Sequence, residues 1–168
     1  MKNSPTFQIM ARGDREIVVT RNFDAPRSLV FDAYTKPDLI KQWLLGPDGW
    51  SMPICEVDLR AGGKYRWVWK SDSSGSEMGM GGTYREVVPG ERIVATEIFD
   101  EAWYPGEALD TIVLIERGGV TTLTQTILYN SRETRDAVLK SPMKDGMAMS
   151  YDRLEKFLPQ VAREALSA

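Results

Sequence analysis

Histidine is absent from the 168-residue sequence, and cysteine occurs once, as Cys55. Without histidine the chain has no imidazole for a general base, for a Ser-His or Cys-His nucleophile, or for a zinc or iron site. A single cysteine allows neither an internal disulfide nor a cysteine-ligated metal cluster. Carboxylates, Lys, Tyr, Ser, Thr and backbone groups remain for any chemistry. The composition therefore favours binding over hydrolysis, and we predict no metal ion, no cofactor and no catalytic residue.

Strong charge and long apolar runs are also lacking. The formal net charge is −3, which gives no electrostatic reason to expect nucleic acid binding. No apolar run is long enough to cross a membrane, and the N-terminal segment shows no signal-peptide pattern. With one free thiol, we expect a cytoplasmic protein.

The length suits a single domain. Residues 1–14 contain several turn-forming residues and are interpreted as a flexible lead-in, and residues 15–166 as the domain. A β-rich segment at 16–23 precedes two short helices, which end before Gly46-Pro47. Glycine-containing turns then separate six predicted strands at about 53–59, 63–70, 80–88, 92–99, 109–117 and 121–129.

A long C-terminal helix is predicted from an apolar stripe at helical spacing. Its members are Met143, Met147, Tyr151, Leu154 and Leu158. Pro142 is expected to break an earlier helical segment, and Pro159 to end or bend the long helix. An antiparallel sheet must cover its apolar face, and this helix is the only element large enough to do so. The pattern predicts an α+β fold.

Several sequence stretches, in this order and spacing, resemble those of a known superfamily. They are Thr20–Pro26, Val30–Pro37, Trp43, Asp58–Tyr65, Gly82–Pro89, Gly146 and Tyr151–Leu154. The chain resembles the bacterial branch of the SRPBCC (START-like) superfamily, whose members are similar to the C-terminal domain of the activator of the heat-shock chaperone ATPase. The resemblance implies the helix-grip fold, in which a curved antiparallel sheet of six to seven strands wraps a long C-terminal helix.

Many members of that superfamily keep a deep apolar cavity between sheet and helix. Large side chains on facing elements could line such a cavity, and they could equally fill a packed core. The resemblance to the superfamily favours the cavity. Tyr65, Trp67 and Trp69 share one face of their strand. The candidate ligand-binding residues are Trp43, Tyr65, Trp67, Trp69, Met80, Tyr84, Trp103, Met143, Met147, Tyr151 and Leu154.

Charged residues offer weaker candidates. Arg21 and Glu86 on predicted strands are interpreted as structural ion pairs or as part of a solvated face. Five acids gather around one predicted loop: Glu97, Asp100, Glu101, Glu107 and Asp110. Paired carboxylates can act as acid and base or hold a hard cation, but we favour a solvated loop at the cavity entrance. Cys55 is expected to be unreactive, because no histidine can activate it.

Three functions follow as hypotheses. The first is a protein that binds a hydrophobic small molecule. The second is a cofactor-independent cyclase- or hydratase-like enzyme acting on a polyketide-like or aromatic substrate, with Tyr65, Tyr84, Tyr151 or Glu86 as acid or base. The third, implied by the resemblance, is a module that docks onto a heat-shock chaperone in a stress response. The sequence leaves open whether the protein is a monomer or a homodimer.

Overall fold

Eight strands form one antiparallel sheet in the computed structural model, which describes residues 6–101 and 104–167. The order across the sheet is β1-β2-β8-β7-β6-β5-β4-β3, and each neighbouring pair is antiparallel. The strands are β1 (Gln8–Arg12), β2 (Glu16–Phe23), β3 (Trp50–Val57), β4 (Lys64–Ser71), β5 (Glu77–Val88), β6 (Arg92–Phe99), β7 (Ala108–Arg117) and β8 (Val120–Leu128).

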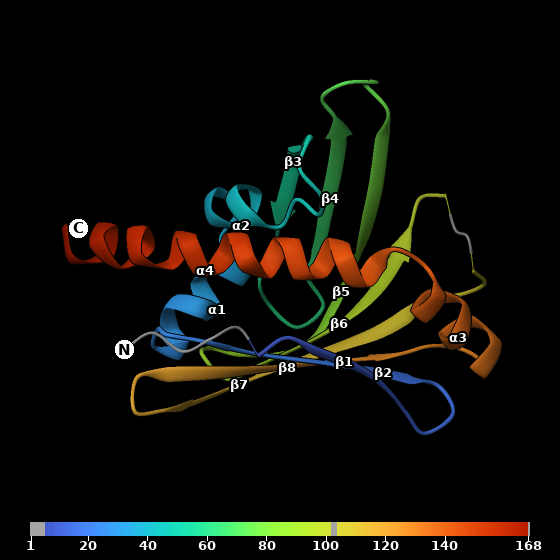
Figure 1. Ribbon diagram of the computed structural model, residues 1–168, viewed down its shortest axis with the longest axis horizontal. Helices are drawn as coiled ribbons and strands as arrows, with labels where there is room; N and C mark the ends of the chain where they lie inside the picture. The colour runs from blue at the N-terminus through green and yellow to red at the C-terminus, as the bar shows by residue number, and fades with distance from the viewer. Residues whose placement is uncertain (1–5, 102–103, 168) are drawn as a thin grey trace.

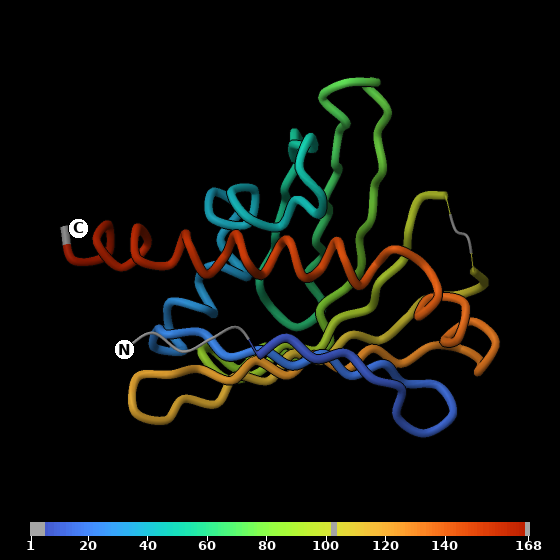
Figure 2. The backbone as a smooth tube through the Cα atoms, viewed as in Figure 1, coloured from blue at the N-terminus to red at the C-terminus, as the bar shows by residue number. Residues whose placement is uncertain are grey.

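The longest helix lies across the hollow of the curved sheet (Figure 1). The helices are α1 (Arg27–Thr35), α2 (Pro37–Trp43), α3 (Arg132–Lys140) and α4 (Met143–Ser167). α4 contacts α1 and α2, and the backbone trace shows the β4–β5 hairpin extending past α4 (Figure 2). Within the described residues, no helix has the length and apolar character needed to cross a membrane. The arrangement confirms the predicted helix-grip fold.

The sheet has eight strands, one more than the upper end of the predicted six to seven. The additional strand, β1, lies in the segment interpreted as a lead-in, so the two short helices follow the second strand instead of the first. β1 pairs with β2 alone, at the edge of the sheet, and most of its residues are exposed. Because this edge strand buries few side chains, its sequence does not alternate between apolar and polar residues. Without that alternation, the strand is difficult to predict from the sequence.

The predicted stripe on α4 is the face that meets the sheet. Tyr151, Leu154 and Leu158 are buried, and Tyr151 and Trp43 stack at 6.0 Å between ring centroids. Pro142 separates α3 from α4 as predicted, but the helix does not end at Pro159, because α4 continues to Ser167. Val161, beyond the proline, is buried, so the helix still packs against the core after the proline.

A buried arginine joins the sheet to α4. The side chain of Arg21 on β2 is fully buried, and its Nη1 lies 2.7 Å from Asp152 Oδ1. Its Nη2 lies 3.7 Å from Glu155 Oε2, and its guanidinium carbon is 5.5 Å from the centroid of the Phe23 ring. Buried charges are found paired, so Arg21 is a structural residue that fixes α4 on the sheet, as predicted.

Candidate functional site

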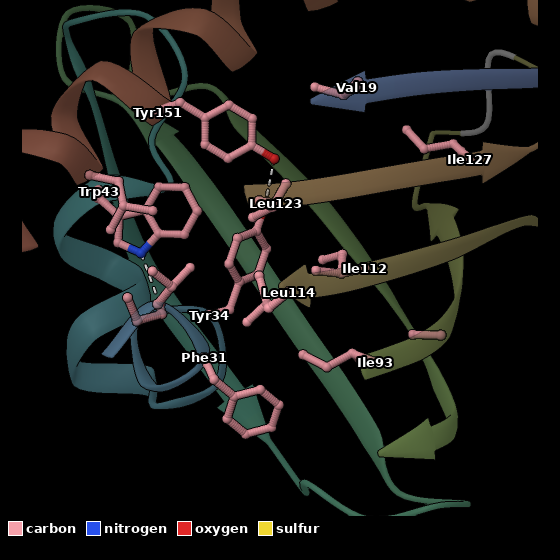
Figure 3. Packing of buried hydrophobic residues seen from close by; sticks show 14 of the residues in the cluster. Val19, Phe31, Tyr34, Trp43, Ile93, Ile112, Leu114, Leu123, Ile127 and Tyr151 are labelled. Carbon is pink, nitrogen blue, oxygen red and sulfur yellow. Dashed lines mark hydrogen bonds between the residues drawn. The ribbon is translucent and has the colours of Figure 1, made fainter. Parts of the chain in front are cut away.

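A cavity of about 630 Å³ lies between α4 and the sheet. Its wall comes from α1, the α2–β3 loop, strands β3 to β8, and the α3–α4 junction with the first turns of α4. Ile93, Ile112 and Ile127 form part of the apolar floor (Figure 3). Space of this size suits a small molecule.

Most of the predicted ligand-binding residues meet at this cavity. Those on its wall are Tyr65, Trp67, Trp69, Met80, Tyr84, Met143, Met147 and Tyr151. Trp43 and Leu154 are fully buried in the core, away from the lining. Trp103 lies outside the described residues. A role in binding ligand stays a prediction for each of these residues.

The rim on the α2 side is held by hydrogen bonds between the α2–β3 loop, α4 and β4. Gly46 N donates to Ser150 Oγ at 2.8 Å, and Arg153 Nη1 donates to the carbonyl oxygen of Trp43 at 2.9 Å. Trp69 Nε1 donates to the carbonyl oxygen of Leu44 at 2.7 Å. These bonds join the end of α2 and the loop after it to α4 and β4, so this part of the cavity wall is preorganised.

The aromatic wall depends on a close approach of β5 to β6. A Cβ atom on Gly82 would lie 1.8 Å from the carbonyl oxygen of Thr96, so only glycine fits there. The same carbonyl accepts a hydrogen bond from the Tyr65 hydroxyl at 2.7 Å. The Tyr65 ring lies between the rings of Trp67 and Tyr84. Its centroid is 4.9 Å from that of Trp67 and 5.3 Å from that of Tyr84.

Two of the five acids assigned to a solvated loop lie on the cavity wall instead, so that interpretation is wrong for Glu97 and Asp110. Both are only partly exposed and both line the cavity. Glu97 on β6 pairs across the sheet with Ala108, two residues before Asp110 on β7, so the two carboxyls are diagonal neighbours on one face. Asp100, Glu101 and Glu107 are exposed, as expected.

A chain of hydrogen bonds leads from α1 to this acid pair. Tyr151 Oη donates to Gln125 Oε1 at 2.9 Å, so in the 2.7 Å contact between Tyr34 Oη and Tyr151 Oη the proton comes from Tyr34 (Figure 3). Gln125 Nε2 then donates to Asp110 Oδ2 at 2.8 Å. Glu97 lies beside Asp110 as its diagonal neighbour on the same face of the sheet. Two carboxylates this close repel each other, so their arrangement favours the protonated form of one of them.

The electrostatics of the pair favour a proton on Glu97. Burial raises the pKa of Glu97 well above its ordinary range, and the neighbouring Asp110 raises it further. Burial also raises the pKa of Asp110, to about 6, while hydrogen bonds from Gln125 and Glu97 act to lower it. At neutral pH the pair therefore holds one proton, on Glu97, and one negative charge, on Asp110.

Other candidate groups are poorly placed for proton transfer. Burial raises the pKa values of the Tyr65, Tyr84 and Tyr151 hydroxyls, which keeps them protonated. Glu86 lies off the cavity wall and pairs with Arg92 at the surface. Burial raises the pKa of Cys55 to about 11, so its thiol is unreactive at neutral pH. Within 6–101 and 104–167, no three His, Cys, Asp or Glu residues are grouped to hold a metal ion.

Glu97, Asp110 and Gln125 are site residues that the sequence reasoning missed. A signal for them existed in the alternation of each strand. Glu97 has the parity of Ile93, Ala95 and Phe99, Asp110 that of Ile112 and Leu114, and Gln125 that of Leu123 and Ile127. Polar residues at apolar-face positions of three adjacent strands indicate a polar spot on the buried face.

Comparisons with known proteins identify a family and solved structures that this chain resembles. The family described as activator of Hsp90 ATPase homolog 1-like protein matches residues 24–159. A crystal structure of a Rhodobacter sphaeroides protein is 31% identical, with a TM-score of 0.85 over 92% of this chain and 98% of that chain. A Chromobacterium violaceum protein is 30% identical, with a TM-score of 0.76 over 86% and 96%.

A structure with lower sequence identity shows that the fold is shared more widely. The solution structure of an AHSA1-like protein from Aeromonas hydrophila is 16% identical, with a TM-score of 0.66 over 83% of this chain and 92% of that chain. No curated protein matches the sequence.

Proposed function

Since this chain belongs to the family of activator of Hsp90 ATPase homolog 1-like proteins and has a cavity beneath its longest helix, we propose that it is a cytoplasmic protein that binds a small, largely apolar molecule. The ligand occupies the space between α4 and the sheet. Its apolar part contacts the aromatic rings of β4 and the methionines of α4. A polar group on the ligand meets the acid pair.

The observation that carries this proposal is the composition of the cavity wall. Aromatic, aliphatic and methionine side chains make up most of it, with a few polar groups at one place. Binding sites for small organic molecules have this composition, with apolar surface for affinity and few polar groups for orientation. Met143 and Met147 add flexible side chains that adapt to the shape of a ligand.

The test uses Nile red, a neutral dye whose fluorescence rises in apolar surroundings. Met147→Trp places a larger side chain on the cavity wall, whereas Met149→Trp makes the same change at a position of α4 that is 44% exposed and off the wall. We expect Met147→Trp to weaken dye binding by about tenfold or more, and Met149→Trp to leave it unchanged. No dye binding to the parent protein, or equal binding by both variants, would contradict the proposal.

Acid–base catalysis on the bound molecule is a second candidate, favoured by the pairing of a protonated Glu97 with an ionised Asp110 at the cavity wall. Such a pair supplies a proton donor and acceptor without a cofactor. The test is turnover of cyclisable polyketide-like or aromatic substrates as a function of pH. The rate should rise near pH 6 as Asp110 ionises. A flat profile, or full activity in Glu97→Gln, would exclude this role.

Docking onto a heat-shock chaperone, which the family name suggests, would use an outer surface instead of the cavity. Stress response and a chaperone partner therefore remain predictions from the sequence. A pull-down with the purified chaperone, with Met147→Trp as a variant altered only inside the cavity, separates this function from ligand binding.

A further inference from the structure

The cavity wall carries charge of one sign only. Among the described residues on it, Glu97 and Asp110 are acids and none is Lys or Arg. Two arginines of α4 and β2 have other partners: Arg153 donates to the carbonyl oxygens of Trp43 and Gly46, and Arg21 pairs with acids of α4. The negative charge on the wall therefore has no cationic side chain opposite it.

An uncompensated charge in apolar surroundings is costly, and a ligand cation would offset that cost. The hydrogen bond from Gln125 holds Asp110 in place but brings no positive charge. The tyrosines of the network are neutral. A ligand that brings a cation would complete the site.

The aromatic residues of the wall favour the same kind of ligand. The rings of Tyr65, Trp67 and Trp69 form a continuous row, with successive centroids 4.9 and 6.0 Å apart. Phe99 lies two residues after Glu97 and also lines the cavity. The faces of aromatic rings attract cations, most strongly where water is excluded. Aromatic rings on the same cavity wall as a carboxylate are therefore complementary to an ammonium group on an apolar body.

We propose that the ligand is an apolar amine, bound as its ammonium cation with the nitrogen against Glu97 and Asp110. This inference rests on the proposed function and adds the chemical class of the ligand. Neutral molecules of the same shape bind more weakly, because they lack the charge-assisted hydrogen bond. Fatty acids and other carboxylates are excluded, because they would bring a second negative charge to the acid pair.

A matched set of probes tests the inference: naphthylethylamine, naphthylethanol and naphthylacetate, which share an apolar body and differ in charge. Their dissociation constants are measured by calorimetry at about pH 8, where Asp110 is ionised. We expect the amine to bind about tenfold to a hundredfold more tightly than the alcohol, and the carboxylate to bind more weakly than the alcohol.

Variants locate the effect on the acid pair. Glu97→Gln with Asp110→Asn removes both acids, and we expect the amine and the alcohol then to bind within about threefold of each other. Glu97→Gln alone keeps the charge on Asp110 and should keep the preference for the amine. The matched control, Glu86→Gln with Asp100→Asn, changes the same residue types at exposed positions off the cavity wall and should behave as the parent.

The outcomes separate this inference from the proposed function. If Nile red binds but the alcohol or carboxylate binds as well as the amine, the cavity binds ligands and the amine inference is wrong. If Nile red binds and none of the three probes does, the amine inference is also overturned. A preference for amine that survives removal of both acids would place its origin elsewhere. If neither the dye nor any probe binds, the proposed function fails as well.

Discussion

Replacing Asp110 with asparagine should make the protein more stable at neutral pH. The Asp110 carboxylate is retained at a cost, because its surroundings on the cavity wall solvate the charge less well than water does and supply no cation in the free protein. Asparagine has nearly the same shape, and its side-chain oxygen can still accept the hydrogen bond from Gln125. Its amide group can donate to Glu97. The substitution therefore removes the charge and keeps the network.

The size of the effect follows from the pKa. Asp110 has a pKa of about 6 in the folded protein, against an ordinary value of 3.8. Between these values the folded state holds a proton that the unfolded state has released, so the free energy of unfolding falls as pH rises. Two pH units correspond to a loss of up to about 3 kcal/mol above pH 6. Below about pH 4 both states are protonated and the loss disappears.

Other groups around Asp110 do not interfere in this range. Those that feel its charge are Glu97 on β6 and the tyrosines at positions 34, 65, 104, 129 and 151. The pKa values of these tyrosines are all raised, so they stay neutral near pH 7. Glu97 keeps its proton because its pKa is raised well above its ordinary range.

Urea denaturation at about pH 4 and about pH 8 measures the difference. We expect Asp110→Asn to exceed the parent by about 2–3 kcal/mol at the higher pH, or about 5–10 °C in melting temperature, and to match it at the lower. Asp100→Asn serves as a control, because Asp100 is exposed and ion-paired with Arg66. A variant that is less stable than the parent at pH 8, or equally displaced at both pH values, would refute the reasoning.

Three further predictions concern the site and the fold. Binding of naphthylethylamine should weaken as pH falls through about 6 while binding of naphthylethanol stays constant, because Asp110 loses its charge; calorimetry across this range shows whether it does. Arg21→Ala should lower the free energy of unfolding by about 3 kcal/mol, because it leaves a cavity at a fully buried position. Asp152→Asn should cost less, about 1–2 kcal/mol, because the amide oxygen still accepts a hydrogen bond from the buried guanidinium although the charge of its partner is lost; both values are read from urea curves. Gly82→Ala should destabilise by about 3 kcal/mol, since its Cβ would meet the carbonyl oxygen of Thr96; a melting temperature equal to that of the parent would show that β5 relaxes without cost.

The architecture was accessible from the sequence because its main elements have strong periodicities. The stripe from Met143 to Leu158 repeats at helical spacing and predicts the buried face of α4, and alternation at Tyr65 to Trp69 predicts β4. These patterns exist because each element buries one face. β1 escaped detection because most of its residues are exposed at the edge of the sheet, which leaves no apolar alternation in the sequence. The helix does not end at Pro159, because local propensity does not define the packing of the residues that follow it.

The site was harder to predict than the fold. Large aromatic residues indicated the cavity wall, but Trp43 has the same character and packs behind Tyr151 in the core. Glu97 and Asp110 looked like loop acids because other acids surround them in sequence. Only the pairing of β6 with β7 brings the two carboxyls together, and such cross-strand neighbours depend on register, which one strand's pattern does not define.

Tryptophans at the cavity also give the protein an optical reporter of its own. Trp50, Trp67 and Trp69 line the space, whereas Trp43 is fully buried outside the lining. Indole emission shifts with the polarity of its surroundings, so a molecule that enters the cavity changes the emission of the first group and leaves that of Trp43 as an internal reference. Occupancy of the cavity can therefore be followed in the unlabelled protein.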